Sequence, residues 1–577
     1  ILLIMRLKPS NFTRKISRVL SKSLKSLIIV TLSLILSVTV YLSFYHKYIK
    51  INNDIPLQPI YNNFNDIIHK MNVYYNPNIT YPYAKSFVEK DTRKEFLENS
   101  LGTYHDRCPT VGLDTNDVKN WPFTSKKALG ENCLVVNPNI KERLYTKHQE
   151  LISTLALNQD PTFQYPGEEL YKGDGIVFVG GGSYSLMTFS VIKVIRASGT
   201  TLPIEVLIPT DEDSRNDVKF CSLIEEYNAK CVYLNRIFSK ELLEENEFKG
   251  FQYKSLALFA SSFENVLLLD ADDYPLKNLD ALFQHKVFKD NGLILWPDFW
   301  RRTTHPFFYE SANVKVDTTK RVRNGLDTVS NLATSLHEGE KTQDMPFHDF
   351  AGTIPDPSSE TGQMMLNKKK HWKTLLLSLF YNIYGPNVFY HLLSQYSSGQ
   401  GDKETFIAAA HLLHLPYYQI FSSASVDGYF TESGDFRGLT YYQKDFRTDY
   451  QAKLMMESEI SLLTSVQDPV YVKQKYFTGD LSEDHALFAH CNQPKFHPLK
   501  MAVNNEFIRD DQHFRGYTHK KCLAGLDLEK EINLAFDELL CGNLDTFNYM
   551  FQKNEINIMC NYVKQRLDLF EREKLFN

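Results

Sequence analysis

A short hydrophobic strand that ends in two carboxylates is the feature that most constrains the fold of this chain. Residues 266–269 are four apolar residues in a row, which is typical of a buried strand, and Pro275 prevents the strand from continuing. Asp270 and Asp272 therefore lie in a tight bend at the carboxyl end of the strand. Two carboxylates one residue apart can share a hard divalent cation, which prefers oxygen ligands. The pair predicts a metal site, and a metal held there could neutralise a diphosphate.

Two other interpretations compete with a metal site. Solvated turn acids produce Asp-x-Asp pairs by chance, and haloacid-dehalogenase phosphatases also carry Asp-x-Asp after a strand. Those phosphatases have Thr or Val two residues after the second Asp, where this chain has Tyr274. The buried strand before the pair and the pattern of elements around it favour the metal site.

Strands and helices alternate around this motif. The expected strands are 176–179, 204–208 and 230–234, and the expected helices lie within 186–195, 220–227 and 254–263. Helical spacing also covers 138–157. The alternation predicts an α/β fold with a mostly parallel sheet. Ligands of such sheets bind beyond the carboxyl ends of the strands, where the Asp-x-Asp pair lies.

Three consecutive glycines, Gly180, Gly181 and Gly182, follow the first of these strands. The dinucleotide fingerprint GxGxxG is not met, because Ser185 stands at its third glycine position. A loop without side chains would still let a nucleotide approach the backbone at the start of a helix. A simple tight turn is the alternative.

The amino end predicts a membrane anchor. Residues 1–26 contain seven basic and no acidic residues, and residues 27–45 are an uncharged apolar run long enough to cross a bilayer. The basic flank predicts a cytosolic tail and places the remaining chain in the lumen. A cleaved signal peptide is the alternative, but the run is too long and no small-residue cleavage site follows it.

The chain after this run is expected to hold a lumenal stem and amino-terminal elaboration over 46–167, followed by a catalytic domain over 168–577. All eight cysteines follow the run, so disulfides are expected, with Cys221 and Cys231 close enough to form a local loop. Asn78 begins a glycosylation sequon. A net charge of −5 gives no reason to expect nucleic acid as a partner.

Five segments together resemble one known family. They are GIVFVGGGSYS (175–185), FQYKSLALFASSFENVLLLDADDYPL (251–276), WPDFWRRTTHP (296–306), GTIPDPSSETGQMMLN (352–367) and GQGDKETFIAAA (399–410). In content and order they are similar to the fungal Golgi α-1,2-mannosyltransferases of glycosyltransferase family 71, which branch cell-wall mannan. The resemblance runs from about residue 173 to 498. Related enzymes that make α-1,3 linkages share this core, so an α-1,3-mannosyltransferase is the alternative.

The resemblance implies a GT-A (Rossmann-like, mixed-sheet) domain over 168–577, with a nucleotide-sugar half at 168–315 and an acceptor half at 316–577. It also implies GDP-mannose as donor, Mn²⁺ as cofactor and retention of the α configuration. The expected acceptor is a mannose of N-linked outer-chain mannan on glycoproteins. The expected location is the Golgi membrane, as a single-pass type II protein that could join a mannosyltransferase complex.

The resemblance also implies a ligand set for the metal. Asp270 and Asp272 match the metal-binding Asp-x-Asp of the family, and His490 ends a later apolar run where many GT-A enzymes place a histidine ligand. A core histidine is the alternative for His490, and His485 or His497 could take its place.

Further residues are expected to contact the donor or the acceptor. Paired arginines suit phosphate or sugar oxygens, and aromatic faces can stack on sugar rings. The alternative is that the tryptophans pack in the core and the arginines form a structural salt bridge. The expected contacts are Gly180, Gly181, Gly182, Lys254, Asp270, Trp296, Asp298, Trp300, Arg301, Arg302, Gln363 and Lys403.

Retention requires a carboxylate on the β face of the sugar or a same-face attack guided by the leaving phosphate. Glu360 is the first candidate for that carboxylate, and Asp402 and Glu404 are the next. The last two start a helix, whose dipole gives them a structural alternative. A non-catalytic scaffold or lectin-like subunit is the rival function, and it predicts mannan binding without turnover.

Overall fold

The structure, a computed structural model, describes residues 57–75, 79–84, 98–113, 118–323, 342–462, 475–477, 485–517, 525–542 and 545–573. The chain divides into two compact units, residues 1–62 and residues 63–577, and the second unit holds the site. The expected cytosolic tail, the membrane anchor at 27–45 and the sequon at Asn78 lie outside the described residues. Within the described ranges, no helix is long and apolar enough to span a membrane.

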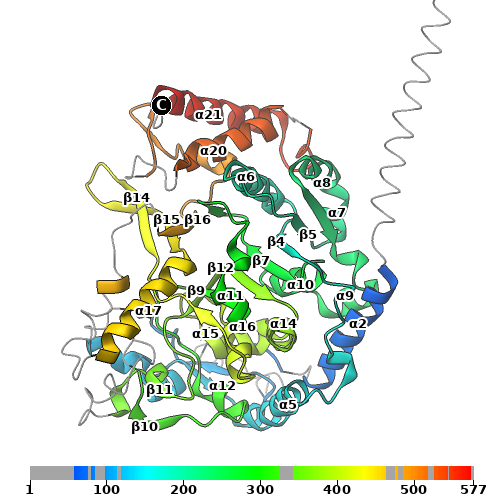
Figure 1. Cartoon of the computed structure of the whole chain (residues 1–577), viewed down its shortest axis with the longest axis vertical. Helices are drawn as coiled ribbons and strands as arrows, with labels where there is room; N and C mark the ends of the chain where they lie inside the picture. The colour runs from blue at the N-terminus through cyan, green and yellow to red at the C-terminus, as the bar shows by residue number, and fades with distance from the viewer. Residues whose placement is uncertain are drawn as a thin grey trace, which may run out of the picture. The chain divides into compact units, whose positions relative to one another are not determined.

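A seven-stranded mixed sheet forms the centre of the second unit, in the order β13-β9-β12-β7-β4-β5-β6 (Figure 1). The strands are β4 (Asp174–Val179), β5 (Ile204–Ile208), β6 (Ala229–Tyr233), β7 (Asn265–Leu269), β9 (Leu293–Pro297), β12 (Ser359–Asn367) and β13 (Tyr418–Gln419). Strands β7, β4, β5 and β6 are parallel, as the alternating pattern predicts. Strand β12 runs antiparallel between β7 and β9, with Gln363 opposite Leu269. The expected α/β class is confirmed.

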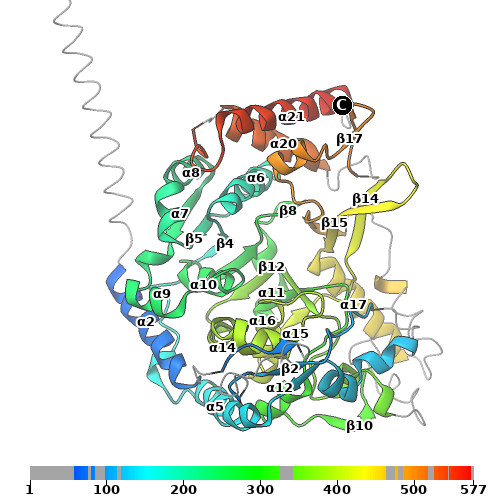
Figure 2. The same cartoon turned by 180° about the vertical axis from the view of Figure 1, so that it is seen from behind.

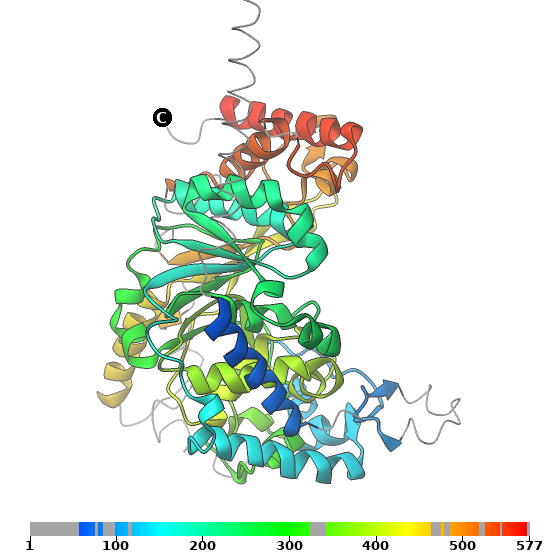
Figure 3. The ribbon, with the colours of Figure 1, turned by 90° about the vertical axis from the view of Figure 1, so that its right-hand side faces the viewer.

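Helices cover both faces of this sheet. Helix α6 (Ser183–Ala197) and helix α10 (Gln252–Ala260) lie on opposite sides of β4 and β5 (Figures 1 and 3). Helices α14 (Trp372–Ile383) and α16 (Lys403–Leu412) pack on the α10 side. The middle of α6 is buried throughout, because it lies between the sheet and the carboxy-terminal helices α20 (Leu528–Phe536) and α21 (Lys553–Arg572).

A second sheet takes the chain directly after the Asp-x-Asp pair. It has the order β14-β15-β16-β8 and is antiparallel throughout (Figure 2). Its strands are β14 (Ser425–Phe430), β15 (Phe436–Lys444), β16 (Ala486–His490) and β8 (Asp273–Pro275). His490 pairs with Asp273 in this sheet. The tight bend expected at residues 270–272 is therefore the point where the chain passes from one sheet to the other.

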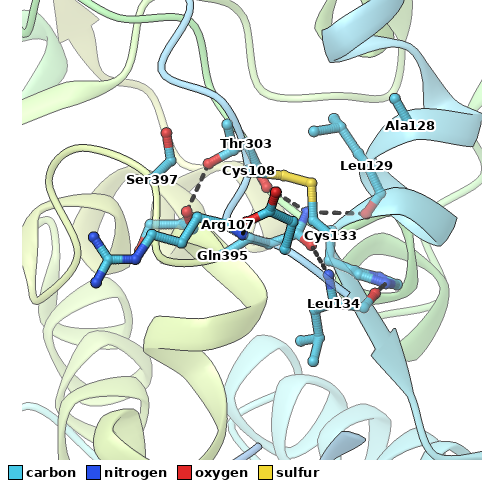
Figure 4. The surroundings of a disulfide bond; sticks show 12 residues. Arg107, Cys108, Ala128, Leu129, Cys133, Leu134, Thr303, Gln395 and Ser397 are labelled. Atoms are coloured by element: carbon cyan, nitrogen blue, oxygen red, sulfur yellow. Dashed lines mark hydrogen bonds between the residues drawn. A yellow bond between two sulfur atoms is a disulfide. The ribbon is translucent and has the colours of Figure 1, made fainter. Parts of the chain in front are cut away.

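The described residues between 79 and 167 belong to the same unit. Strands β1 (Tyr83–Ala84), β2 (Gly102–Tyr104) and β3 (Leu134–Val136) form a small sheet, and α5 (Pro138–Ala156) matches the helix expected there. A disulfide joins Cys108 to Cys133 (Figure 4). Beside it, the Gln395 side chain donates to the carbonyls of Leu129 and Thr303 and accepts from the amide of Leu134. These bonds tie the segment to the core.

Two further disulfides, Cys221–Cys231 and Cys541–Cys560, join residues near each other in the chain. The local loop expected for Cys221 and Cys231 is confirmed. Cys491 carries a buried free thiol. Between β5 and β6 lie two short helices, α7 (Asp211–Asn216) and α8 (Val218–Ile224).

Candidate active site

Three potential metal ligands come together at the passage from β7 to β8. Asp270, Asp272 and His490 each offer one ligand atom, and these three atoms lie within 4.8 Å of one another. Nε2 of His490 lies 3.4 Å from Oδ1 of Asp272. The amide of Asp270 donates to the carbonyl of Gly362 at 2.7 Å, and that of Cys491 to the carbonyl of Asp272 at 2.9 Å. Among the described residues, neither alternative histidine belongs to this group.

The charges of neighbouring groups act on both His490 and Asp272 of this metal triad. Burial alone would lower the pKa of His490, but the Asp272 and Glu360 carboxylates raise it to about 10. Burial opposes ionisation of Asp272, yet His490 and Lys495 hold its pKa below the usual range. Nδ1 of His490 is buried and has no hydrogen-bond partner in the described part of the chain. Carboxylates suit Mg²⁺ and Mn²⁺, and imidazole suits transition metals, so the residues present fit a divalent metal.

Lys495 is a second charge that sequence reasoning missed. Its Nζ lies 2.7 Å from Oδ2 of Asp272, although half of its side chain remains exposed. A single lysine in a polar loop after β16 carries no recognisable signal. The pairing of β16 with β8 is what brings this loop to the Asp-x-Asp turn.

A pocket with a volume of about 530 Å³ opens beside the metal triad. It is lined by the loop 179–184 after β4, by residues 209–213 after β5, by the start of α10, by Asp270 and Asp272, and by Lys495. The strand ends that line it are carboxyl ends of neighbouring strands, where α/β sheets bind their ligands. Its size is typical of small-molecule sites.

The glycine loop at this pocket requires glycine. The φ angles of Gly181 and Gly182 are +98° and +55°, a backbone region that side chains disfavour. A Cβ atom on Gly181 would also lie only 2.9 Å from Oδ2 of Asp213. Helix α6 begins directly afterwards, and its N-cap, Gly182, supplies no capping side chain. The start of α6 is therefore suited to an anionic group.

Asp213 is a second lining residue that sequence reasoning missed. It lies in the first turn of α7, and Thr210 Oγ1 donates a hydrogen bond of 2.5 Å to it. A carboxylate at this end of the pocket can accept N–H or O–H groups of a nucleoside. Acidic residues in a first helical turn are common, so the sequence offered no distinguishing signal.

Lys254 lines the same pocket and pairs with the Asp-x-Asp motif. Its Nζ lies 2.9 Å from Oδ1 of Asp270 and donates to the carbonyl of Thr361 at 3.0 Å. Burial opposes its charge, but Asp270 and Asp402 raise the pKa of Lys254. Its contact with a donor stays a prediction.

The three candidate carboxylates differ sharply in their surroundings. Oε1 of Glu360 accepts from the amides of Thr361 and Gly362, both at 2.8 Å. Burial opposes its ionisation, but the neighbouring cations, His490 foremost, hold the pKa of Glu360 below its usual range. Burial raises the pKa of Asp402 to about 6.

Glu404 lies in the packed interior and not in the pocket. It is ion-paired with Arg302, and its Oε1 accepts from the amide of Ser359 at 2.6 Å. Both side chains of the ion pair are almost wholly buried. Glu404 also stands in the first turn of α16, where the helix-dipole alternative places it.

Several other expected contact residues are also buried away from the pocket. Trp296 is fully buried and donates its indole N–H to the carbonyl of Lys444 at 2.8 Å. Arg301 pairs with Asp356 at 2.8 Å inside the protein. The packing and salt-bridge alternatives therefore describe Trp296, Arg301 and Arg302, because each has its polar groups taken by protein partners. These residues lie at and after the end of β9, where the indole and guanidinium groups bind other groups of the protein.

Asp298, Trp300 and Lys403 are not among the residues that line the pocket. Lys403 is ion-paired with Asp298. Burial and the Glu360 charge raise the pKa of Asp298, whereas the charge of Lys403 lowers it, and the net shift is upward. Trp300 is half-buried. Tyr441 pairs with His490 in the second sheet, and its ring lies 4.9 Å from that of Phe299.

Gln363 is fully buried on β12, and in the described part of the chain its amide has no hydrogen-bond partner. Its expected contact with a substrate stays a prediction.

Comparisons with known proteins agree on one family. A family model described as "Mannosyltransferase putative" matches residues 173–451. The α-1,2-mannosyltransferase MNN2 of Saccharomyces cerevisiae is 40% identical over 493 residues, which cover 81% of this chain and 81% of that protein. The α-1,2-mannosyltransferase MNN5 of the same species is 36% identical over 472 residues, covering 76% and 80%.

Among solved structures, the galactosyltransferase LgtC in complex with donor and acceptor sugar analogs aligns with 63% of this chain and 95% of its own. The sequence identity is 13% and the TM-score is 0.26.

Proposed function

Because this chain belongs to the fungal α-1,2-mannosyltransferase family, we propose that it transfers mannose from GDP-mannose to a mannose hydroxyl of N-linked outer-chain mannan. The observation that carries the proposal is the metal triad at the edge of a nucleotide-sized pocket. The proposal includes a GT-A domain, retention of configuration, and a Golgi type II placement behind the anchor expected at 27–45.

The pocket supports a nucleotide diphosphate as the donor. The start of α6 is suited to an anion, whereas the amides of Gly181 and Gly182 in the preceding loop are taken by Ser185 and Asp217. Lys254 and Lys495 add positive charge beside the Asp-x-Asp turn. Asp213, which lies beside Gly181 and Gly182, suits the hydroxyl or N–H groups of a nucleoside better than a phosphate, because like charges repel.

Asp270, Asp272 and His490 are the residues that would hold Mn²⁺. A metal bound there supplies positive charge that stabilises the departing diphosphate. Lys495 keeps Asp272 ionised and Lys254 holds Asp270 in place, so the ligand set is ordered in advance. The backbone bonds at both ends of the turn restrict it further.

Glu360 is the carboxylate best suited to the β face of the donor mannose. Neighbouring cations, His490 foremost, hold the pKa of Glu360 below its usual range, and its Oε1 is fixed by two amides. Asp402 binds Thr361 Oγ1 at 2.9 Å and its pKa of about 6 makes it a weaker candidate. Glu404 is the weakest candidate, because its carboxylate is buried in an ion pair with Arg302.

The acceptor side of the site is proposed to include Asp298, Trp300 and Lys403. Half-buried aromatic rings beside a carboxylate are suited to a pyranose, which presents both apolar C–H and hydroxyl groups. Phe299 and Tyr441 extend this surface.

The test uses the full chain with GDP-mannose, Mn²⁺ and an α-mannoside acceptor, and it measures GDP release and product linkage by nuclear magnetic resonance. We expect GDP release that requires both metal and acceptor, and an α-1,2 product. An α-1,3 product would correct the linkage. Mannan binding without turnover would replace the proposal by the scaffold function. Full activity of Asp272→Ala would refute the role of the metal triad.

A further inference from the structure

Asp217 is a fully buried carboxylate that the proposed chemistry does not use. It lies between α7 and α8, and each of its oxygens accepts one hydroxyl. Ser185 Oγ donates to Oδ2 at 2.6 Å, and the Tyr549 hydroxyl donates to Oδ1 at 2.5 Å. A buried carboxylate is costly unless it is hydrogen-bonded, so these bonds are what keep Asp217 inside.

The same carboxylate is connected to the backbone of the glycine loop. Ser185 Oγ, which donates to Asp217, also accepts from the amide of Gly181 at 2.8 Å. Burial raises the pKa of Asp217, while hydrogen bonds from Ser185, Tyr549 and the Gly182 amide act in the opposite direction. A continuous hydrogen-bond chain therefore runs from Tyr549 through Asp217 and Ser185 to the loop.

The glycine loop needs such external support. Gly181 and Gly182 both have positive φ, and three consecutive glycines have no side chains with which to hold one conformation. Glycine loses more conformational freedom on ordering than any other residue. A ligand that had to order this loop would therefore bind more weakly than one that meets it already ordered.

Tyr549 comes from the carboxy-terminal part of the chain, 332 residues from Asp217. In that part α20 packs against α6 (Figures 1 and 3). The Phe547 ring lies 6.3 Å from that of Phe220 on α8. The Cys541–Cys560 disulfide closes the segment that carries Tyr549. The hydroxyl is thus brought to Asp217 by a packed and cross-linked segment.

We propose that Tyr549 and Asp217 are positioning residues that hold the glycine loop in the shape that receives the donor nucleotide. The carboxy-terminal segment is then a working part of the donor site, although it does not line the pocket. This inference rests on the proposed function, because it assigns the nucleotide of the donor to the loop.

The experiment compares Tyr549→Phe with a matched control, Tyr562→Phe, in the full chain. Tyr562 also belongs to the carboxy-terminal part, and its buried hydroxyl donates to the carbonyl of Glu506 at 2.7 Å. Each variant removes one tyrosine hydrogen bond, which is partly buried at Tyr549 and buried at Tyr562, but only the first removes a bond to Asp217. The readouts are GDP binding by calorimetry, and KM for GDP-mannose and kcat at saturating acceptor.

For Tyr549→Phe we expect GDP affinity to fall and donor KM to rise by about fivefold, the effect of one lost hydrogen bond. We expect kcat to stay within about twofold, because saturating donor orders the loop. Tyr562→Phe should keep the GDP affinity and the donor KM of the parent. If Tyr549→Phe does not fold, Ser185→Ala tests the same hydrogen-bond chain from its other end.

Unchanged GDP affinity in Tyr549→Phe, or an equal loss in Tyr562→Phe, would overturn the inference. The failure of the proposed function looks different. In that case the parent protein would not release GDP from GDP-mannose, whereas GDP binding would still report on the loop.

Discussion

The buried ion pair between Arg302 and Glu404 provides the sharpest test of how the site is built. The Arg302 side chain has no exposed surface and that of Glu404 has 3%. Arg302 also donates from Nε to the carbonyl of Pro355 at 2.6 Å and from Nη2 to Oε1 of Gln419 at 3.1 Å. Glu404 in turn accepts from the amide of Ser359, the first residue of β12. The pair therefore holds the start of the strand that carries the next residue, Glu360.

Replacing Arg302 by Met leaves Glu404 buried without its counter-charge. Removing one partner of a buried ion pair costs about 3–5 kcal/mol, because the remaining charge cannot be hydrated. We therefore expect Arg302→Met to lower the free energy of unfolding by about that amount. In the double variant Arg302→Met/Glu404→Leu neither charge remains, and we expect most of the loss to be recovered.

Urea unfolding followed by circular dichroism measures these differences, and donor KM is measured on the same samples. A structural role predicts a large stability loss, with little change in donor KM for the protein that remains folded. The reasoning would be refuted by an Arg302→Met variant that unfolds like the parent but has a donor KM raised about tenfold, equivalent to about 1.4 kcal/mol of lost binding. Arg302 would then be a phosphate ligand, as the sequence suggested.

Three further predictions follow from other residues of the site. Glu360→Gln should lower kcat by about 10²–10³-fold while GDP affinity changes less than about twofold, since it removes charge beside the reacting carbon; steady-state kinetics and calorimetry measure both, and parent-like kcat would remove Glu360 from the mechanism. Asp402→Asn should stabilise the protein above pH 6 by about 2–3 kcal/mol, because the folded-state pKa of Asp402, about 6, lies above the ordinary value of 3.8. The carboxylate then costs stability as the pH rises through that window, and urea unfolding at pH 4 and pH 7.5 should show the gain only at the higher pH; an equal gain at both would contradict the assignment. Gly181→Ala should weaken GDP binding by about tenfold or more, because its φ is +98° and the new Cβ would meet Asp213; calorimetry that detects no change would show that the loop does not contact the ligand.

Much of the central sheet could be predicted because its signals are local. A run such as 266–269 is apolar over its whole length, so it can only be buried, and parallel strands follow from the helices between them. Pro275 ended the predicted strand, yet residues 273–275 form β8 of a second sheet. The bend was predictable, but its role in joining two sheets was not, because the partner strand β16 lies more than 200 residues later.

The metal site was predictable to a similar degree. Asp270 and Asp272 are separated by one residue in the chain and need only a strand end to converge. His490 was suggested by the apolar run before it, and the register of β16 with β8 is what brings it to 3.4 Å from Asp272. Lys495 and Asp213 carried no local signal, since a lone charge in a loop has the same appearance in sequence whether or not it lines a pocket.

The Asp-x-Asp strand, the glycine loop and the alternation of strands and helices were thus determined by the sequence itself, because hydrophobic periodicity and backbone preference act over a few residues. Which charged and aromatic residues face the ligand was decided only by the tertiary structure. Arg302 found Glu404 about 100 residues away, and Asp217 found Tyr549 more than 300 residues away. A side chain binds the partner that the fold brings to it, and the residues next to it in the sequence do not identify that partner.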